Sequence, residues 1–412
     1  MRILYHHRTR GEDAQGVHIH SLCAAFEGLG HEVKMVAPLG GQSPRPSSSR
    51  RQVDSEIANE AQQTQQPQEA RPTLCGMPIP SWFYELLALA YNIPAFLVLL
   101  GQAWVRRPDM IYERYTLFSC AGWWVSRVLR RPFILEVNAP LSLELQSYGG
   151  GLVFSALAQF IEDRLCAAAT RTVVVSQAMA DIFSARGVPR DRLLVVPNGV
   201  DAAAFNTTVD GSAVRRRYAL QGCRVIGFVG WVRPWHGVDG LLRGVAQRLA
   251  ADDEVRVLIV GDGPALAGLR QLAVELGIAE RVIFTGAVAR EEIPAYIAAL
   301  DIAVQPDVTD YASPIKLFEY LALGCAVIAP DKANIREVVR HDETALLFPA
   351  CDWPALGQQV EVLLEDSERR QRLARAAARL ISDGGYTWQS NAQRVVDIVD
   401  LAGSQPSPAG ES

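Results

Sequence analysis

Residues Asp310 to Pro330 read D-Y-A-S-P-I-K-L-F-E-Y-L-A-L-G-C-A-V-I-A-P, and the fold prediction starts from this stretch. Ser313 is expected to cap a helix, because its hydroxyl can accept from a first-turn amide, with Pro314 at the first helical position. Gly324 is placed to end this helix, and Ala326 to Ala329 reads as a short buried strand. The stretch therefore predicts one helix–strand step of an α/β domain.

Two charged side chains on the predicted helix point to a ligand site. Lys316 lies in the first turn, where the helix dipole disfavours a cation, so a nearby anion would explain its position. Free amides, the dipole and the ammonium group would together hold a phosphate. Glu319 lies one turn later and could accept hydrogen bonds from sugar hydroxyls. A solvated Lys316–Glu319 pair explains the same spacing equally well.

The stretch resembles the signature of family 4 retaining glycosyltransferases, which have the α/β GT-B fold of two doubly wound Rossmann-like domains facing a cleft. Glu319 matches the second Glu of the family's Glu pair, and A-L-G-C-A-V matches the family's A-x-G-x-P-V-type strand. Tyr311 stands where the family has its first Glu, and Asp310 is our candidate for the missing carboxylate. S-P-I-K-L-F-E-Y resembles a recurring subgroup of the family. The resemblance implies donor binding by Ser313, Pro314, Ile315, Lys316, Leu317 and Glu319.

Length and composition describe an ordinary globular protein. The 412 residues suffice for two domains with full cores, at 49% hydrophobic and 21% charged residues. The net charge of -5 gives no support for nucleic-acid binding. Seven scattered cysteines without a C-x-x-C pair argue against a zinc site or disulfides and favour a cytoplasmic protein. The N-terminus has no long apolar core, so no signal peptide is expected.

The order of expected elements, read with the resemblance, divides the chain into four parts. Residues 1–200 form an N-terminal, acceptor-side Rossmann-like domain, and residues 201–385 form a C-terminal domain that binds the nucleotide sugar. Residues 386–402 resemble the family's helix that crosses back to the N-terminal domain, and residues 403–412 are expected to be disordered. Residues 40–72 lack hydrophobic periodicity and predict a flexible insertion.

The most apolar segment runs from Trp82 to Val105 and allows three interpretations. The simplest is a buried or half-buried helix pair broken at Pro94. The second is a helix lying at a membrane surface, with Trp82, Phe83 and Trp104 at the headgroup level. A membrane span is disfavoured, because the strand-like segment Met110 to Glu113 comes almost at once after it.

Polar residues of the N-terminal domain come after its expected strands. Gly16 and His18 open the first helix, in a G-V-H-I-H run that resembles the family's cleft-facing loop. The other candidates come after two later strands, where loops at strand carboxyl ends carry ligand groups. These are Glu113, Arg114 and Tyr115 in the loop after one strand, and Glu136 and Asn138 at the end of the next strand, Pro132 to Asn138. The prediction is a cleft lined by converging loops.

In the C-terminal domain the loop after the strand Arg224 to Gly230 reads G-W-V-R-P-W-H-G. Trp231 and His236 stand where the family usually has an Arg and a Lys. Arg233 or His236 is therefore expected to supply the positive charge beside Lys316. The next strand leads into G-D-G-P, which matches the family's V-G-x-G-P turn and adds Gly261 and Gly263 to the donor-binding candidates with Gly230 and His236.

The resemblance implies a cytoplasmic enzyme of polysaccharide biosynthesis that can bind peripherally at the inner face of a membrane. It would transfer a hexose from a nucleotide sugar to a glycan or lipid-linked acceptor, with retention and without a metal ion or cofactor. The absence of a D-x-D run agrees with metal-free phosphate binding. The predicted catalytic residues are Lys316, Arg233, Asp310 and His18. Two other classes stay open: a non-catalytic nucleotide-sugar binder and an NAD-type oxidoreductase, against which the missing third Gly of G-x-G-x-x-G argues.

Overall fold

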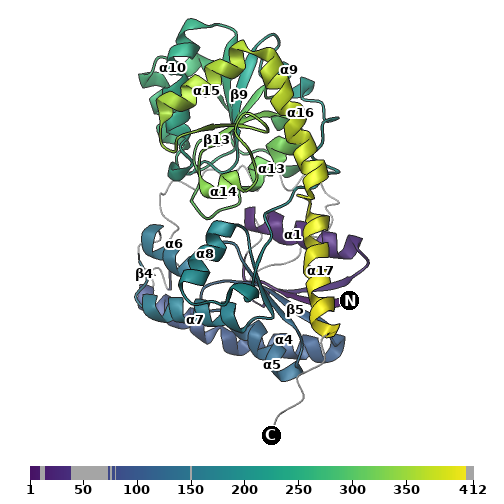
Figure 1. The fold of residues 1–412 in the computed structure, drawn as a ribbon. Coiled ribbons are helices and arrows are strands. Elements are labelled where there is room, and N and C mark those ends of the chain that lie inside the picture. Colours follow the sequence, from purple (N-terminus) through teal and green to yellow (C-terminus); the bar gives the residue numbers. More distant parts are fainter. Residues whose placement is uncertain (10–13, 39–72, 75–76, 79, 149–150, 405–412) are drawn as a thin grey trace, which may run out of the picture. The chain divides into compact units, whose positions relative to one another are not determined.

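The computed structural model of the protein describes residues 1–9, 14–38, 73–74, 77–78, 80–148 and 151–404 (Figure 1). The predicted insertion at residues 40–72 and most of the predicted tail lie outside the described residues. Contacts divide the chain into two compact units: residues 1–173, 183–194 and 399 onward, and residues 174–182 with 195–398. The predicted boundary at residue 200 falls five residues after the long segment of the second unit begins.

The first unit is built on a six-stranded sheet in the order β2-β1-β5-β6-β7-β8. β1 pairs in parallel with both neighbours, since Ile3 lies opposite Val33 of β2 and Met110 of β5. A parallel sheet covered on both faces needs apolar strands, and Ile3, Leu4 and Tyr5 are each at most 1% exposed. The strands are β1 (Arg2–His6), β2 (Glu32–Val36), β5 (Met110–Arg114), β6 (Phe133–Val137), β7 (Arg171–Val174) and β8 (Leu193–Val195), besides the short pair β3 (Thr73–Leu74) and β4 (Met77–Pro78).

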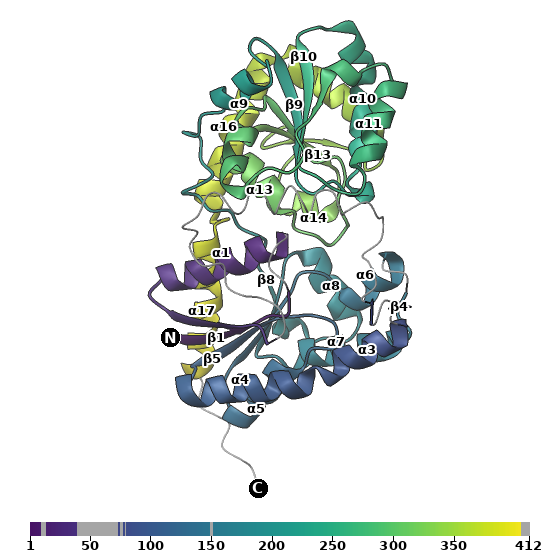
Figure 2. The ribbon, with the colours of Figure 1, turned by 180° about the vertical axis from the view of Figure 1, so that it is seen from behind.

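Helices cover both faces of this first sheet, with α1 on one face and α4 and α5 on the other (Figure 2). The helices of the first unit are α1 (Ala14–Gly28), α3 (Ser81–Ala90), α4 (Asn92–Arg106), α5 (Ala121–Leu129), α6 (Leu141–Tyr148) and α7 (Ser155–Ala168), with the 3-10 turn η1 (Arg190–Arg192). Helix α8 (Gln177–Ala185) is shared, because its residues 177–182 belong to the second unit. The predicted helix pair is confirmed, but its break lies at Tyr91 and not at Pro94. Pro94 falls in the first turn of α4, where no intrahelical bond needs its missing N–H.

The second unit repeats the architecture around a sheet in the order β11-β10-β9-β12-β13-β14. Every pairing is parallel, and the core residues of the central strands are completely buried. The strands are β9 (Arg224–Val229), β10 (Val255–Val260), β11 (Val282–Phe284), β12 (Ile302–Val304), β13 (Ala326–Pro330) and β14 (Leu346–Phe348). The fold class predicted from the sequence, two doubly wound α/β units, is confirmed.

Helices alternate with the strands of the second unit as far as β14, and three further helices follow. The helices of this unit are α9 (Ser212–Arg217), α10 (Val238–Ala251), α11 (Leu266–Glu275), α12 (Ile293–Ala298), α13 (Ile315–Ala322), α14 (Ala333–Arg336), α15 (Trp353–Glu365), α16 (Ser367–Gly384) and α17 (Trp388–Ser404). Short 3-10 turns are η2 (Pro234–His236), η3 (Ala279–Arg281) and η4 (Arg290–Glu292). The final helix starts at Trp388, two residues after the predicted start of the last part of the chain.

The helix of the opening stretch, α13, ends as predicted but begins differently. Gly324 adopts φ +69° just after the helix, a left-handed conformation that favours glycine. The predicted cap at Ser313 is wrong, because Pro314 holds the N-cap position with an extended backbone and no side chain caps the helix. The Ser313 hydroxyl instead accepts from the backbone N–H of Asn198, a buried donor that needs a partner.

The strand order locates a ligand site in the second unit. From β9 the chain proceeds through β10 and β11 to one side of the sheet, and β12, β13 and β14 lie on the other. In doubly wound sheets the crevice at the carboxyl ends of the two strands flanking this change of direction is where ligands bind. A ligand site is therefore expected at the loops after β9 and β12.

Candidate functional site

Lys316 and the loop after β9 meet at this edge of the sheet. Gly230 comes directly after β9, and a Cβ atom there would lie 3.0 Å from Lys316 Nζ. Gly230 also adopts φ +139°, which side chains rarely tolerate. The loop thus needs a glycine both for its conformation and for the close approach of the lysine amine.

The amine of Lys316 is buried without a hydrogen-bond partner among the described residues. Its Nζ atom lies 4.1 Å from the ring centroid of Phe228, so a cation–π contact is its closest stabilising interaction. Burial lowers the pKa of Lys316 to about 7, an effect that Glu319 only partly opposes. An amine that is half charged near neutral pH and lies beside the loop after β9 is suited to an anionic ligand.

His236 lies beside Lys316 but does not supply positive charge. Burial, followed by repulsion from Lys316, lowers the pKa of His236 to about 3, so the imidazole is neutral at physiological pH. Its Nδ1 accepts from the backbone N–H of Arg233 (3.5 Å), and its carbonyl accepts from the backbone N–H of Asp307 (3.0 Å). The prediction that His236 supplies positive charge is therefore wrong for the ligand-free protein, in which His236 stabilises the loop through these hydrogen bonds.

Arg233 remains as the candidate cation of this loop, beside Lys316 of α13. Its guanidinium lies 5.0 Å from the ring centroid of Trp235 and makes no ion pair with a carboxylate in the described part of the chain. Trp235 and Trp231 flank it and are 39% and 54% exposed. The loop beside Lys316 therefore exposes two indole rings and a guanidinium group that forms no ion pair with the described carboxylates.

Gly261 and Gly263 have a packing role in the structure. A Cβ at Gly261 would lie 2.2 Å from the carbonyl oxygen of Gly230, and one at Gly263 would lie 2.4 Å from that of Val232. Both positions also have φ in the range that favours glycine, +120° and +153°. The G-D-G-P turn therefore supports the loop after β9 backbone to backbone, and direct donor contact by these glycines stays a prediction.

Glu319 lies one turn into α13 and is buried, at 4% exposed. Its Oε1 forms an ion pair with Arg290, a residue that no sequence motif marks. The Arg290 guanidinium also lies 4.8 Å from the ring centroid of Phe205. The predicted solvated Lys316–Glu319 pair does not form, because Glu319 uses Arg290 as its partner.

Asp310 is 87% exposed and reaches Lys332 Nζ at 3.1 Å. Lys332 also contacts Asp307 at 2.8 Å and donates to the carbonyl of Val308. Burial alone would lower the pKa of Lys332, but its bonds to Asp307 and Asp310 outweigh it and raise the pKa. Tyr311 is buried, and its carbonyl accepts from the Ser176 hydroxyl at 2.7 Å. Asp310, the candidate for the missing carboxylate, is thus accessible to a ligand, whereas Tyr311 is buried.

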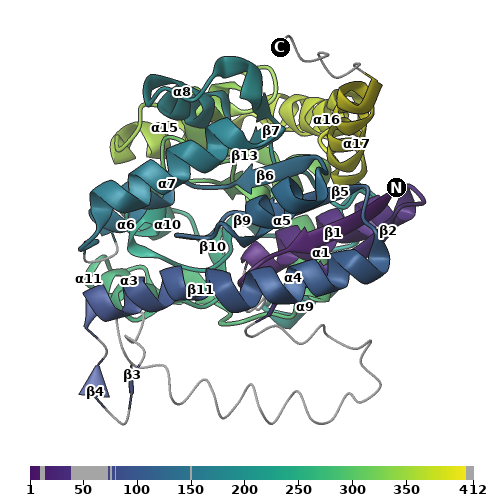
Figure 3. The ribbon, with the colours of Figure 1, turned by 90° about the horizontal axis from the view of Figure 1, so that it is seen from below.

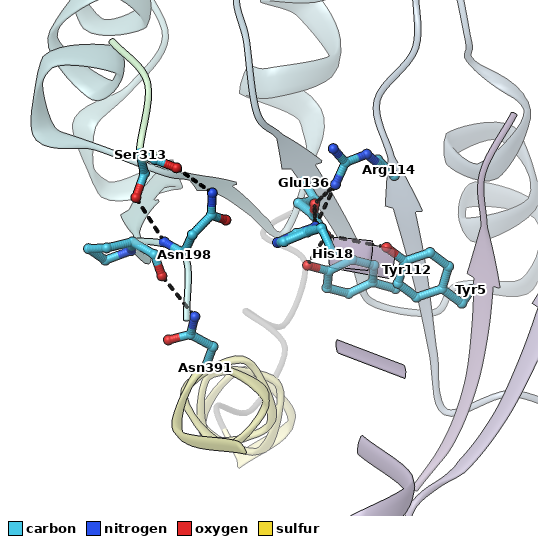
Figure 4. Close-up of polar contacts among 9 residues, drawn as sticks. Tyr5, His18, Tyr112, Arg114, Glu136, Asn198, Ser313 and Asn391 are labelled. Carbon is cyan, nitrogen blue, oxygen red and sulfur yellow. Dashed lines mark hydrogen bonds and ion pairs between the residues drawn. The ribbon is translucent and has the colours of Figure 1, made fainter. Parts of the chain in front are cut away.

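A chain of amide contacts fixes the start of α13 (Figure 4). The side chain of Asn198 donates to the carbonyl of Ser313 at 2.6 Å, while its backbone N–H donates to the Ser313 hydroxyl at 3.0 Å. Asn391 of α17 donates to the carbonyl of Pro197 at 2.8 Å. Buried hydrogen bonds of this kind hold the helix start in one position, as an anion site requires.

In the first unit the predicted polar loops form a buried network instead of a cleft lining. Glu113, Arg114 and Glu136 lie within strands β5 and β6 and are at most 6% exposed. The prediction of three converging loops is therefore wrong for these residues. Glu113 pairs with His6 at 3.2 Å, so its carboxylate is used inside the core. Tyr115 is likewise buried, while Asn138 is only half-buried just after β6.

Glu136 is the centre of this network (Figure 4). Arg114 Nη1 lies 2.6 Å from both Glu136 Oε1 and His18 Nδ1, and the Tyr112 hydroxyl donates to Oε2 at 2.7 Å. Burial opposes ionisation, but attraction to His18 and Arg114 holds the pKa of Glu136 at about 2. Burial lowers the pKa of His18, although its contact with Glu136 opposes this effect. Gly16 is buried in the first turn of α1, two residues before His18.

Two family profiles match the sequence. The profile of glycosyltransferase family 4 matches residues 15–204, and that of glycosyl transferases group 1 matches residues 214–380. Among curated relatives, a D-inositol 3-phosphate glycosyltransferase of Nocardia farcinica is 29% identical over 310 residues, covering 71% of this chain and 66% of the relative. A GDP-mannose-dependent alpha-(1-6)-phosphatidylinositol monomannoside mannosyltransferase of Mycobacterium tuberculosis is 31% identical over 235 residues, covering 55% and 60%. The chain thus spans less than two thirds of the length of these two relatives.

Solved structures agree on the fold. Anabaena HepE in complex with UDP superposes with a TM-score of 0.74 at 20% identity, covering 97% of this chain and all of that one. Sucrose-phosphate synthase of Thermosynechococcus elongatus gives a TM-score of 0.72 at 17% identity, covering 98% and 99%. The fold is GT-B, as predicted. At this level of identity the likeness concerns the fold alone.

Proposed function

We propose that this protein transfers a hexose from a nucleotide sugar to a glycan or lipid-linked acceptor, because its two profile matches indicate a glycosyltransferase of family 4, group 1. The reaction proceeds with retention of the anomeric configuration and needs no metal ion or cofactor. The bond between the anomeric carbon and the diphosphate oxygen breaks, an acceptor hydroxyl oxygen bonds to that carbon, and the hydroxyl proton passes to the departing diphosphate. The nucleoside diphosphate is the leaving group.

The buried and unpartnered amine of Lys316 is the observation that carries this proposal. A diphosphate bound between Gly230 and the start of α13 would accept hydrogen bonds from the ammonium group of Lys316 and from the first-turn backbone N–H groups of Ile315 and Lys316. The amide of Leu317 is already used, since it donates to the carbonyl of Pro314 at 3.0 Å. Charge that develops on the diphosphate as the glycosidic bond breaks is stabilised by this fixed set of donors.

The remaining predicted residues are assigned by distance from Lys316. Glu319, one turn further into α13, accepts hydrogen bonds from the donor's ribose with the oxygen that Arg290 does not hold. Arg233 supports the diphosphate from the loop after β9. Asp310, presented by the loop before α13, faces the transferred sugar.

The donor and acceptor classes rest on the relatives. The Mycobacterium tuberculosis relative is named for GDP-mannose and phosphatidylinositol monomannoside, and the Nocardia farcinica relative is named for D-inositol 3-phosphate. The proposed donor is accordingly a nucleoside diphosphate hexose, and the proposed acceptor carries sugar or polyol hydroxyls, free or on a lipid. The cytoplasm, where nucleotide sugars are made, is the proposed location, and polysaccharide or glycolipid assembly is the proposed process.

A thermal-shift panel tests the proposal. GDP-mannose, UDP-glucose, GDP, UDP and NAD are each added to the purified protein, because a ligand at a hundredfold excess over its Kd stabilises the native state by about 2.7 kcal/mol. At least one nucleotide sugar and its nucleoside diphosphate should raise the melting temperature, and NAD should not. The proposed function would be contradicted if NAD alone stabilised the protein. It would also be contradicted if the protein neither hydrolysed any of the nucleotide sugars nor transferred sugar from them.

A further inference from the structure

The pair α3–α4 has its polar side chains inside and its apolar side chains outside. Glu85 is 2% exposed and accepts from the backbone N–H groups of Val153 and Phe154 at 2.8 and 2.9 Å. Asn92 is 2% exposed and donates to the carbonyl of Phe118 at 2.7 Å. These two hydrophilic groups of the apolar segment are therefore used against the rest of the first unit.

The outward side of the pair carries large apolar side chains. Ile93 and Leu97 are 64% and 62% exposed, and Trp104 and Val105 are 76% and 77% exposed. Exposed positions recur at 86, 90, 93, 97, 101 and 104, the three- and four-residue spacing of one helix side. A helix that faces water places charged and polar residues on this side, so the stripe indicates a contact with something apolar.

The apolar stripe continues onto α5, which packs beside α4 (Figure 3). Phe96 and Trp124 meet edge to face with ring centroids 6.2 Å apart. Trp124 and Val128 on α5 are themselves 37% and 59% exposed. We call the exposed apolar side chains of α3, α4 and α5 the outer face.

Basic residues border the outer face at one end. α4 leads into β5 and α5 leads into β6, and these strands run in parallel with Ile111 opposite Phe133. The carboxyl ends of both helices therefore lie at the same edge of the sheet. This edge carries Arg107, Arg127, Arg130 and Arg131, all exposed. The chain as a whole has a net charge of -5, so this local excess of arginine runs against the overall sign.

A transmembrane arrangement does not fit the packing. Judged by length and composition alone, the helical stretch Ser81–Arg106 is long and apolar enough to cross a membrane. However, Ala95, Leu99 and Ala103 are at most 1% exposed, in the core beneath the sheet. A span would strip these contacts and the partners of Glu85 and Asn92. A helix that lies in the plane of the interface keeps them all.

A second copy of the chain fits the outer face poorly. A two-fold interface brings the same surface together, so each arginine would have to face an acid or another arginine. α3, α4 and α5 expose no acid, since their one acidic residue is the buried Glu85. Anionic lipid headgroups provide the missing negative charge, and acyl chains provide the apolar partner.

We propose that the outer face is a membrane-docking surface, on which the first unit lies at an anionic bilayer with α3–α4 parallel to the membrane plane. Trp82 and Trp104, near the two ends of the pair, lie at headgroup depth, while Phe83 is half-buried in the protein and takes less part. The arginine edge contacts lipid phosphates. This inference stands on the first unit and does not depend on the function proposed for the second.

Vesicle sedimentation with the full chain tests the docking surface. The probes are vesicles of pure phosphatidylcholine and vesicles with about one third phosphatidylglycerol. Leu97→Glu and Trp104→Glu replace exposed side chains, so both variants should keep the wild-type melting temperature. Val274→Glu in α11 is the matched control, because Val274 is 61% exposed and lies in the other unit.

Wild type and Val274→Glu should bind the anionic vesicles, with the Trp emission of wild type shifting to the blue. Leu97→Glu and Trp104→Glu should each bind about tenfold more weakly, and Arg130→Gln/Arg131→Gln about tenfold more weakly on anionic vesicles only. Wild type that stays in the supernatant with both vesicle types would overturn the proposal. So would a dimer by light scattering that Leu97→Glu dissociates. Donor-induced stabilisation, measured on the same variants, reports separately on the proposed function.

Discussion

The two units treat a buried charge in opposite ways. In the first unit Glu136 is surrounded by Arg114, His18 and Tyr112, all within 3.0 Å, and its pKa is held at about 2 (Figure 4). In the second unit the amine of Lys316 has no hydrogen-bond partner among the described residues, and burial lowers its pKa to about 7. One charge is paired and stable without a ligand, and the other is not.

This difference separates a structural network from a binding site. A buried ion pair with satisfied hydrogen bonds holds the fold in one arrangement, and removing one partner leaves the other uncompensated. A buried amine without a partner destabilises the free protein and gains most when an anion arrives. Substitutions in the two units should therefore differ in whether they change stability or turnover.

Glu136→Gln should destabilise the protein by about 3–5 kcal/mol, because Arg114 would stay buried without a counter-charge. The folded pKa of about 2 lies below the ordinary 4.5. The stabilisation from Glu136 is therefore complete above pH 4.5 and is lost as the pH falls toward 2. Denaturant unfolding at about pH 7 and pH 3 measures both effects. Asp109→Asn, at a half-buried carboxylate paired with the exposed Arg2, serves as control, with a change of about 1 kcal/mol or less. A Glu136→Gln protein as stable as wild type would contradict the structural role.

Lys316→Ala should lower donor-dependent turnover by about a hundredfold or more, since the diphosphate would lose its cationic partner. The fold should survive, because the amine donates no hydrogen bond within the described chain. Burial lowers the folded pKa of Lys316 from 10.5 to about 7, so the lysine weakens the free fold at neutral pH, and its loss should not lower the melting temperature. Steady-state kinetics and a melting curve on one preparation decide this. Wild-type turnover in a folded variant would remove Lys316 from the site.

Asp310→Asn should reduce kcat by about tenfold or more, about 1.4 kcal/mol, with nearly unchanged nucleotide affinity, if Asp310 faces the transferred sugar. Its side chain is 87% exposed, so its pair with Lys332 contributes little to stability. Asp331→Asn, which removes another carboxylate paired with an exposed cation, is the control. Unchanged kcat for Asp310→Asn would return the question to Tyr311.

Glu319→Gln should weaken nucleotide binding by about fivefold, because a neutral amide accepts hydrogen bonds from ribose less strongly than a carboxylate. The change also frees Arg290, so Arg290→Gln is the informative comparison. If Glu319 reads the ribose, its substitution should weaken binding of a nucleoside diphosphate more than binding of pyrophosphate. Calorimetry with both ligands measures the difference, and equal losses for the two would refute a ribose contact.

The sequence predicted the second unit more fully than the first. Gly324, the strand after it and the position of Lys316 in a first helical turn result from local rules about glycine, apolar runs and dipoles, and the structure confirms them. Ser313 was predicted wrongly because its hydroxyl is used by Asn198, which lies 115 residues away. Local capping rules do not contain such a partner.

The side chains that the sequence did not reveal are those defined by tertiary contacts. Arg290 and Lys332 belong to no motif, and only the fold brings them to Glu319 and Asp310. The prediction placed Glu113 in a loop and Glu136 at a strand end, because ligand groups in such sheets come from the carboxyl ends of strands. The fold instead buries them within the sheet, where His6 lies 3.2 Å from Glu113 and Arg114 lies 2.6 Å from Glu136. For α3–α4, composition indicated a buried or interfacial helix, and only the burial of Glu85 and Asn92 shows which side faces outward.

The proton balance of nucleotide binding tests the central contrast most directly. At about pH 8 the free amine of Lys316, with a pKa of about 7, is mostly neutral, and a bound diphosphate should recharge it. Calorimetry of nucleoside diphosphate binding in two buffers of different ionisation enthalpy counts the protons taken up. We expect about 0.5 to 1 proton for wild type, and none for Lys316→Arg, whose guanidinium is always charged. Binding by wild type without proton uptake, or the same uptake in Lys316→Arg, would contradict the assignment of Lys316 as the unpaired cation of the donor site.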